Sequence, residues 1–162
     1  MNRHNLIQQL QAHQAFDERE HATGVVLLKF VQTYENCAAR ELQIGHLTGS
    51  AWIVDQDLTH TDMLSASWRE AREESGLQNL RLLVPNIFDL DIHTIPARNK
   101  EPEHFHYDIR YAFQADRHAP LTVSSESREL AWVALDKIEA LTTEESVLRM
   151  VSKTAELRTR TR

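Results

Sequence analysis

The glutamates in "REAREESGL", residues 69–77, are the side chains whose types and spacing point most directly to chemistry. On an α-helix Glu70, Glu73 and Glu74 stand at i, i+3 and i+4, so their carboxylates converge on one patch. Hard carboxylate oxygens suit Mg²⁺, which keeps several waters and also accepts phosphate oxygens as ligands. The spacing therefore predicts a divalent-cation site on a helix that ends at Gly76, a residue suited to the left-handed C-terminal position.

An ordinary solvated helix face is the alternative interpretation, with Arg69 paired to Glu73 four residues later. Two features weigh against it. Glu70 and Glu74 form a like-charge i, i+4 pair, which costs roughly 0.2–0.5 kcal/mol. Both also lie in the C-terminal half of the expected helix, where the helix macrodipole disfavours anions. A bound divalent cation removes both penalties.

The same segment resembles the second half of the Nudix box, whose pattern is Arg-Glu, an aliphatic residue, any residue, Glu-Glu, any residue, Gly and an aliphatic residue. The matching positions are Arg69, Glu70, Ala71, Glu73, Glu74, Gly76 and Leu77. "GHLTGSAWIV", "IHTIPARNKEPEHFHYDIRY" and "SSESRELAWVAL" extend the resemblance over roughly residues 45–136. It implies an αβα sandwich that uses Mg²⁺ or Mn²⁺ to hydrolyse a pyrophosphate in a nucleoside diphosphate-linked substrate.

The resemblance also implies roles for individual residues. Glu70, Glu73 and Glu74 match the metal-holding positions, and Arg69 matches the arginine that orients a box carboxylate. The implied mechanism is attack of a metal-activated water on a phosphorus of the pyrophosphate. Glu126 in "SSES" is the candidate for a further carboxylate that acts as base or ligand, and a solvated loop residue is the alternative for it.

The first half of the family motif is absent. Counted back from Arg69, the usual glycine falls on Asp55 and the usual glutamate on Thr61. Family members place a strand and a Gly-Gly loop before the box helix, but only "DQDLTH" separates Val54 from Thr61 here. A true deletion favours a weak or inactive module that binds a nucleotide or a protein. If a segment is instead omitted from the printed sequence, the hydrolase interpretation holds in full. We expect this second case, with a break in the chain between Val54 and Thr61.

The apolar pattern predicts the elements that position these groups. "NLIQQLQAHQAF" and "ATGVVLLKFVQTY" predict two helices, although Val25 and Val26 also suit a strand. Residues 46–54 and 129–135 predict strands, and "TTEESVLRMVSKTAEL" predicts a closing helix begun by Thr142 or Thr143. We expect a single compact α/β (α+β) domain with a mixed or antiparallel sheet, in which residues 1–40 form an N-terminal helical extension to a Nudix-like domain over residues 41–162.

Strict alternation in "HFHYDIRYAF" places polar side chains on one strand face, namely His104, His106, Asp108 and Arg110. The same alternation in "IFDLDIHTI" groups Asp89, Asp91 and His93. These histidines could bind zinc, since His-X-His is a common ligand spacing, but a polar face lining a substrate cleft is favoured because no cysteine accompanies them. The candidate substrate-binding residues are Arg98, His104, His106 and Arg110, and Lys100 is a further cation for phosphate.

The composition of the chain limits the classes of partner that we expect. The net charge of −6 over 162 residues gives no electrostatic support for general nucleic-acid binding. No apolar run reaches membrane-spanning length, and the single cysteine, Cys37, fits a reduced, cytoplasmic setting. We expect a small nucleotide-like substrate, no nucleic-acid or membrane partner, and a homodimer. The N-terminal helices are expected either to cover the sheet or to form the dimer contact.

Overall fold

The computed structural model describes most of the chain, namely residues 2–55, 72, 75–77, 79–98, 101–122 and 131–160. In these residues the fold is α+β, with helices packed around a mixed sheet. The predicted break between Val54 and Thr61 falls on an interval that lies outside the described residues. Within the described residues, no helix combines the length and apolar character needed to cross a membrane.

Two helices open the chain, as the sequence predicts. Helix α1 covers Arg3–Ala12 and α2 covers Glu18–Thr33. Each begins at a side-chain cap, because Asn2 accepts a hydrogen bond from the N–H of Asn5 and Asp17 accepts one from the N–H of Glu20. The guanidinium of Arg3 donates to the carbonyl oxygens of Val31 and Gln32, which ties the start of α1 to the end of α2.

The sheet is built around its longest strand, β4 (His104–Ala115). Strand β1 (Gly45–Asp55) pairs with it in parallel, and β3 (Asp89–Ile95) and β2 (Arg81–Leu82) pair with its other edge in antiparallel. The sheet is therefore mixed, as expected. Among the described strands, β1 has β4 as its single partner and forms an edge.

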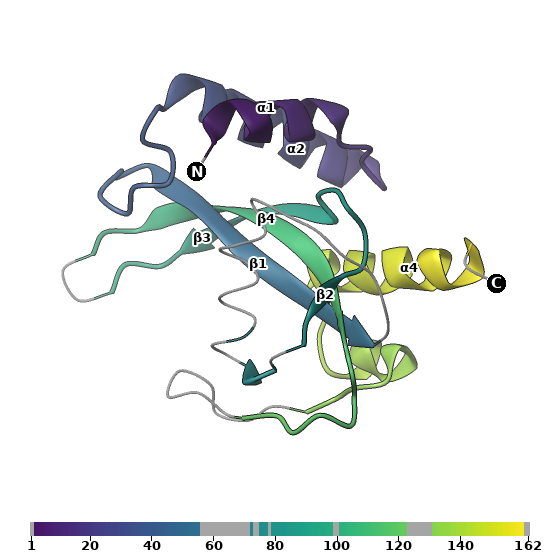
Figure 1. Ribbon diagram of the computed structural model, residues 1–162. Coiled ribbons are helices and arrows are strands. Elements are labelled where there is room, and N and C mark those ends of the chain that lie inside the picture. The colour runs from purple at the N-terminus through teal and green to yellow at the C-terminus, as the bar shows by residue number, and fades with distance from the viewer. Residues whose placement is uncertain are drawn as a thin grey trace.

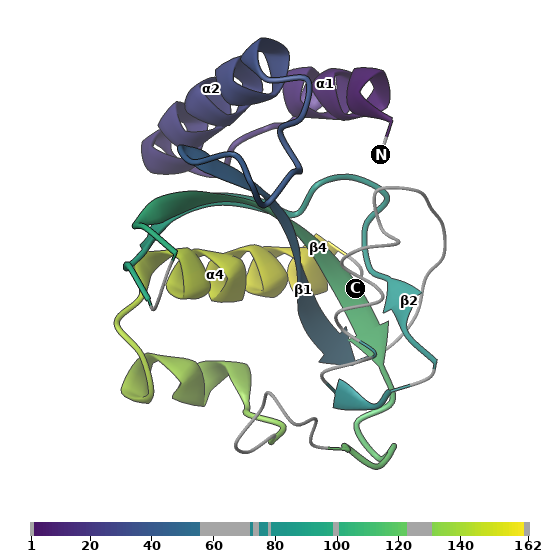
Figure 2. The same ribbon diagram turned by 90° about the vertical axis from the view of Figure 1, so that its left-hand side faces the viewer.

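Helices cover both faces of this sheet (Figures 1 and 2). Helices α1 and α2 lie on one face, where Leu6, Leu27 and Phe30 join β-strand residues in the main core. Phe30 stacks on Tyr107 of β4 with ring centroids 3.7 Å apart. Helix α4 (Glu145–Arg160) lies on the other face, where Met150 packs with Phe88 and Ala112. The N-terminal helices thus share one core with the sheet.

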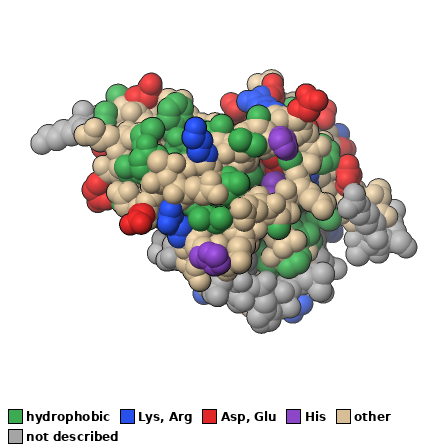
Figure 3. Space-filling view, turned by 90° about the horizontal axis from the view of Figure 1, so that it is seen from above, with side chains coloured by type: hydrophobic (Ala, Val, Ile, Leu, Met, Phe, Trp, Pro, Cys, Tyr) green, Lys and Arg blue, Asp and Glu red, His purple; other side chains and the backbone are tan. Residues whose placement is uncertain are grey.

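The outer surface of the N-terminal helices carries hydrophobic side chains among polar and charged ones (Figure 3). Val25 and Val26 of α2 are 56% and 50% exposed. Their β-branched side chains therefore face outward from a helix, whose inner side is supplied by Leu27, Phe30 and Val31.

Two expectations for the C-terminal part are wrong. The predicted strand over residues 129–135 is absent where it is described: residues 131–134 have no regular structure and Leu135–Ala140 form a 3₁₀ helix, η1. Trp132 and Val133 are partly exposed, and no described strand pairs with them. Without a partner strand, their high β propensity does not produce a strand. The predicted closing helix is present, but it begins at Glu145 instead of at Thr142 or Thr143. Thr142 accepts a hydrogen bond from the N–H of Glu144 just before the helix.

Candidate functional site

Side chains from three strands form one polar face of the sheet. On β4, His106, Asp108 and Arg110 stand beside His46, Thr48 and Ser50 of β1. The same residues of β4 stand beside His93, Asp91 and Asp89 of β3. Residues in one row of a sheet project to the same side, so the predicted polar faces of β3 and β4 merge. We call this surface, together with His104, the polar face.

Arg110 occupies the middle of the polar face and contacts three aspartates. Its Nε donates to Asp108 Oδ2 at 2.8 Å, and its terminal nitrogens lie 3.3 Å from Asp89 Oδ2 and 2.8 Å from Asp91 Oδ2. Burial alone would lower the pKa of Arg110, but the surrounding carboxylates raise it. Burial would likewise raise the pKa of Asp91, yet a contact with His93 and the charge of Arg110 lower it to about 2.

Arg110 therefore has a structural role in this fold. Its side chain is 11% exposed, and every arm of the guanidinium faces a carboxylate. The hydroxyls of Thr48 and Ser50 donate to the remaining oxygen of Asp108, at 3.0 and 2.8 Å. This network locks β1, β3 and β4 together, and a contact between Arg110 and substrate phosphate stays a prediction.

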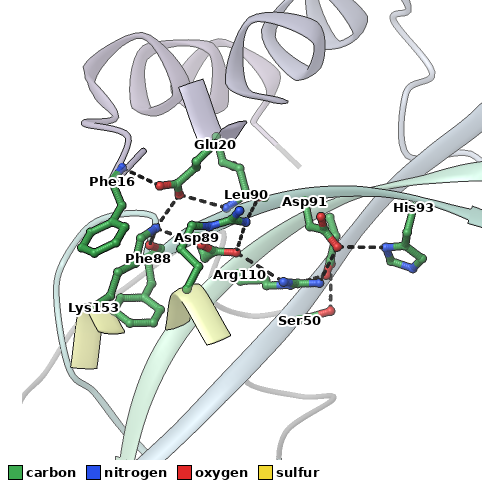
Figure 4. Close-up of polar contacts among 12 residues, drawn as sticks. Phe16, Glu20, Ser50, Phe88, Asp89, Leu90, Asp91, His93, Arg110 and Lys153 are labelled. Carbon is green, nitrogen blue, oxygen red and sulfur yellow. Dashed lines mark hydrogen bonds and ion pairs between the residues drawn. The ribbon is translucent and has the colours of Figure 1, made fainter. Parts of the chain in front are cut away.

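A second group of charges is buried beside β3 (Figure 4). Asp89 accepts hydrogen bonds from Arg149 and Lys153 of α4, at 2.7 and 2.9 Å from its Oδ1. Lys153 also donates to Glu20 of α2, and both carboxylates have no exposed surface. We call Glu20, Asp89, Arg149 and Lys153 the buried charge cluster. Because α4 and α2 contribute its members, the cluster holds both helices to the same strand.

Histidines gather at the opposite end of the polar face. The ring of His46 lies 4.7 Å from that of His106 and 5.5 Å from that of His104, centroid to centroid. His93 lies 5.5 Å from His106 and forms an ion pair with Asp91 at 3.5 Å. His46, His104 and His106 each offer one ring nitrogen that could bind a metal, and these three nitrogens lie within 4.8 Å of one another. We call these three residues the histidine triad.

Gly45 allows the next residue, His46 of the triad, to lie close to β4. Gly45 has a φ of +137°, and a Cβ at this position would lie 2.1 Å from the carbonyl oxygen of Phe105. A larger residue would push the start of β1 away from β4. Gly45 thereby keeps His46 in register with His106.

Burial and mutual repulsion keep protons off part of the triad. Desolvation is the main cause that lowers the pKa of His46, and His104 and Arg40 lower it further. Desolvation and the neighbouring histidines lower the pKa of His106 to about 4. The contact with Asp91 raises the pKa of His93 in the opposite direction. His46 and His106 are therefore neutral imidazoles at neutral pH, the form that binds metals.

Most of the other predicted site residues cannot be placed relative to the polar face. Glu70, Glu73, Glu74, Arg69, Lys100 and Glu126 lie outside the described residues. Arg98 is exposed in the β3–β4 connection, where its backbone pairs with that of Glu101. His104 and His106 come together, as their spacing on one strand predicts.

His46 and the buried charge cluster were not predicted from the sequence. The alternation of "HLTGS" could have placed His46, Thr48 and Ser50 on one face of β1. No local sequence pattern predicts that β1 pairs with β4, which lies 60 residues further along the chain. Glu20 and Lys153 likewise stand in amphipathic helices, where charged residues are ordinarily exposed.

Comparison with known proteins adds no relative: no family model matches the chain, and no curated protein matches it significantly.

Proposed function

We propose that the protein is a Mg²⁺- or Mn²⁺-dependent hydrolase of the Nudix type that cleaves a pyrophosphate bond in a nucleoside diphosphate-linked substrate. The observation that carries the proposal is the end of the segment "REAREESGL". Arg72 and Ser75 have helical backbone, and Gly76 follows with a φ of +72°. The N–H of Gly76 donates to the carbonyl of Arg72 at 2.9 Å, a left-handed helix cap. Helical backbone that ends at Gly76 supports the i, i+3, i+4 interpretation of the glutamates, which themselves lie outside the described residues.

The surroundings of this cap support the candidate base. The N–H of Thr122 donates to the carbonyl of Ser75 at 2.9 Å. Thr122 precedes Glu126 by four residues, a length of chain that spans at most about 14 Å. The segment that leads to Glu126 therefore starts beside Ser75, next to the cap at Gly76, and Leu77 after the cap is 2% exposed.

The overall arrangement also agrees with the sandwich that the resemblance implies. Helices lie on both faces of a mixed sheet, and β1 runs parallel to β4. In the proposed site Glu70, Glu73 and Glu74 bind the cation, and Glu126 holds a proton or a further cation. When bound, the cation neutralises phosphate charge and lowers the pKa of a water. Arg98 is exposed in the β3–β4 connection, and in the proposed site it contacts a phosphate of the substrate.

The experiment is a screen of nucleoside diphosphate derivatives for phosphate or nucleotide release with Mg²⁺ and with Mn²⁺. Glu74→Gln and Glu73→Gln should each lower kcat/KM at least about 100-fold, because losing a residue one shell further from a metal already costs about 10- to 100-fold. Glu144→Gln is the matched control, since Glu144 is exposed before α4. Equal rates in all three variants would remove the proposal.

A module that binds without turnover is the second candidate. The absent Gly-Gly loop and the free edge of β1 among the described strands favour it. A phosphate-facing loop aligns the substrate, and misplacement of about 1 Å can cost 10²-fold in rate. Metal-dependent binding of a nucleoside diphosphate by calorimetry, with no product in the same sample, would identify this alternative.

A further inference from the structure

The histidine triad has the geometry of a metal-ligand set. His104 and His106 are two residues apart on β4, so their rings project to the same side, 5.3 Å apart. His46 enters from the neighbouring strand in register with His106. Each ring offers a nitrogen within 4.8 Å of those of the other two. Three side chains from two paired strands are thus held together by the sheet itself.

The hydrogen bonds of the triad leave lone pairs available. His104 Nδ1 lies 3.0 Å from the carbonyl oxygen of Pro102. A carbonyl only accepts, so Nδ1 carries the proton and Nε2 of the neutral ring keeps its lone pair. This is the arrangement that orients histidine ligands at metal sites. His46 Nδ1 is buried and has no hydrogen-bond partner among the described residues, in a side chain only 8% exposed.

An unpartnered nitrogen in a buried ring carries a cost. Burying a polar atom without a hydrogen bond is unfavourable. A cation bound through this nitrogen removes that cost.

We infer that His46, His104 and His106 form a binding site for a transition-metal ion, with Zn²⁺ as the best-fitting ion and a water in its fourth position. Zn²⁺ accepts three histidine nitrogens at about 2.0–2.1 Å in tetrahedral geometry, which places ligand nitrogens roughly 3.3 Å apart. Metal binding requires the triad, whose nitrogens lie within 4.8 Å of one another, to close to this spacing by side-chain rotation, and His104 and His106 are only half-buried. His93 stays outside the set because it faces Asp91.

This site differs in ligand class from the proposed glutamate site. Imidazole nitrogens suit Zn²⁺, Co²⁺ or Ni²⁺, whereas Mg²⁺ prefers carboxylate oxygens. The two sites therefore respond to different ions, and the inference stands whether or not the protein is a hydrolase. A polar cluster of stacked rings that holds no metal is the alternative explanation.

The test uses the full, untagged chain after chelator treatment and titrates it with Co²⁺, whose visible absorption reports tetrahedral nitrogen coordination. We expect saturation at one equivalent for the triad, followed by displacement of Co²⁺ by Zn²⁺ and no displacement by Mg²⁺. Featureless binding, or displacement by Mg²⁺, would overturn the inference.

Variants assign the ligands. His46→Ala, His104→Gln and His106→Ala should each weaken Co²⁺ binding at least about 100-fold, whereas His21→Ala, an exposed histidine of α2, should leave it unchanged. Since truncation of the buried His46 also removes core packing, the half-buried His104→Gln provides the second readout, with its metal-free circular dichroism as the check on folding. Co²⁺ affinity equal to wild type in folded His104→Gln would exclude the triad. Glu74→Gln should not alter Co²⁺ binding, so failure here and failure of the hydrolase proposal are separate results.

Discussion

Lys153 of α4 and Glu20 of α2 form a buried ion pair beside β3, although 133 positions separate them in the chain (Figure 4). The two helices lie on opposite faces of the sheet, so this pair links the layers by charge. Asp89 completes the arrangement by accepting from Lys153 and from Arg149. Lys153 also donates to the carbonyl of Phe88, at 2.7 Å.

The first prediction removes the cation of this pair. Lys153→Met leaves Glu20 and Asp89 buried with fewer partners, and breaking a buried pair on one side typically costs about 3–5 kcal/mol. We expect the free energy of unfolding to fall by about this amount in urea denaturation. Lys137→Met is the control, because Lys137 pairs with Asp136 where both side chains are over 70% exposed, and exposed pairs contribute little. A change equal to that of the control would show that the cluster carries no net stability.

The second prediction concerns acid. Burial would raise the pKa of Glu20, but hydrogen bonds from His13, Lys153 and the N–H of Phe16 lower it from 4.5 to about 2. Because the folded-state pKa is depressed, the stabilisation is present above pH 4.5 and is lost as the pH falls towards 2. Glu20→Gln should therefore be less stable than wild type at neutral pH and converge with it near pH 2.

Denaturation series at several pH values measure this convergence. The exposed Glu139→Gln of η1 is the control and should track the wild type throughout. A constant difference between Glu20→Gln and wild type from neutral pH down to pH 2 would contradict the assigned pKa direction.

Local patterns in the sequence predicted much of the fold. The two N-terminal helices, β1 and the alternating faces of β3 and β4 each follow from a periodicity contained in one segment. The parallel partnership of β1 with β4 depends on contacts such as Thr48 to Asp108, 60 residues apart, and no local pattern encodes it. The strand predicted over residues 129–135 is the reverse case: in its described part, residues 131–135, side chains with high β propensity have no partner strand among the described strands.

The candidate site divides in the same way. His104 and His106 were identifiable because their spacing lies within one strand. His46 joins them only through strand pairing. The contacts of Arg110 with Asp89 and Asp91 likewise depend on the pairing of β4 with β3, which no local pattern predicts.

The third prediction tests the helix cap at Gly76. An L-residue in the left-handed conformation costs roughly 1–2 kcal/mol, and a Cβ at Gly76 would lie 2.5 Å from Cβ of Thr122. We expect Gly76→Ala to lower the free energy of unfolding by at least this amount and to reduce the Mg²⁺-induced rise in melting temperature. Asn is better tolerated than Ala in this conformation. The part of the stability loss that comes from backbone conformation should therefore be smaller in Gly76→Asn. An Ala variant as stable as wild type would contradict the cap.

The last prediction concerns the edge of β1. In a parallel pair, alternate residues of an edge strand direct their N–H and C=O groups away from the partner. Leu47 is one of these, since its N–H donates to the carbonyl of Cys37 at 2.7 Å, and Ala51 shares its orientation. Among the described strands this edge has no further partner, and an unpaired edge is a template for a second copy. We expect a homodimer by light scattering at high micromolar concentration.

Two variants distinguish the dimer surfaces. Ala51→Pro removes an outward N–H and is tolerated on an edge strand, so it should give a folded monomer if β1 edges pair. Val26→Glu places a charge on α2, where Val26 is 50% exposed, and should leave a β1-mediated dimer intact. Monomer from Val26→Glu with dimer from Ala51→Pro would instead assign the contact to the N-terminal helices. A wild-type monomer at high micromolar concentration would exclude both surfaces, because neither then associates strongly enough to matter.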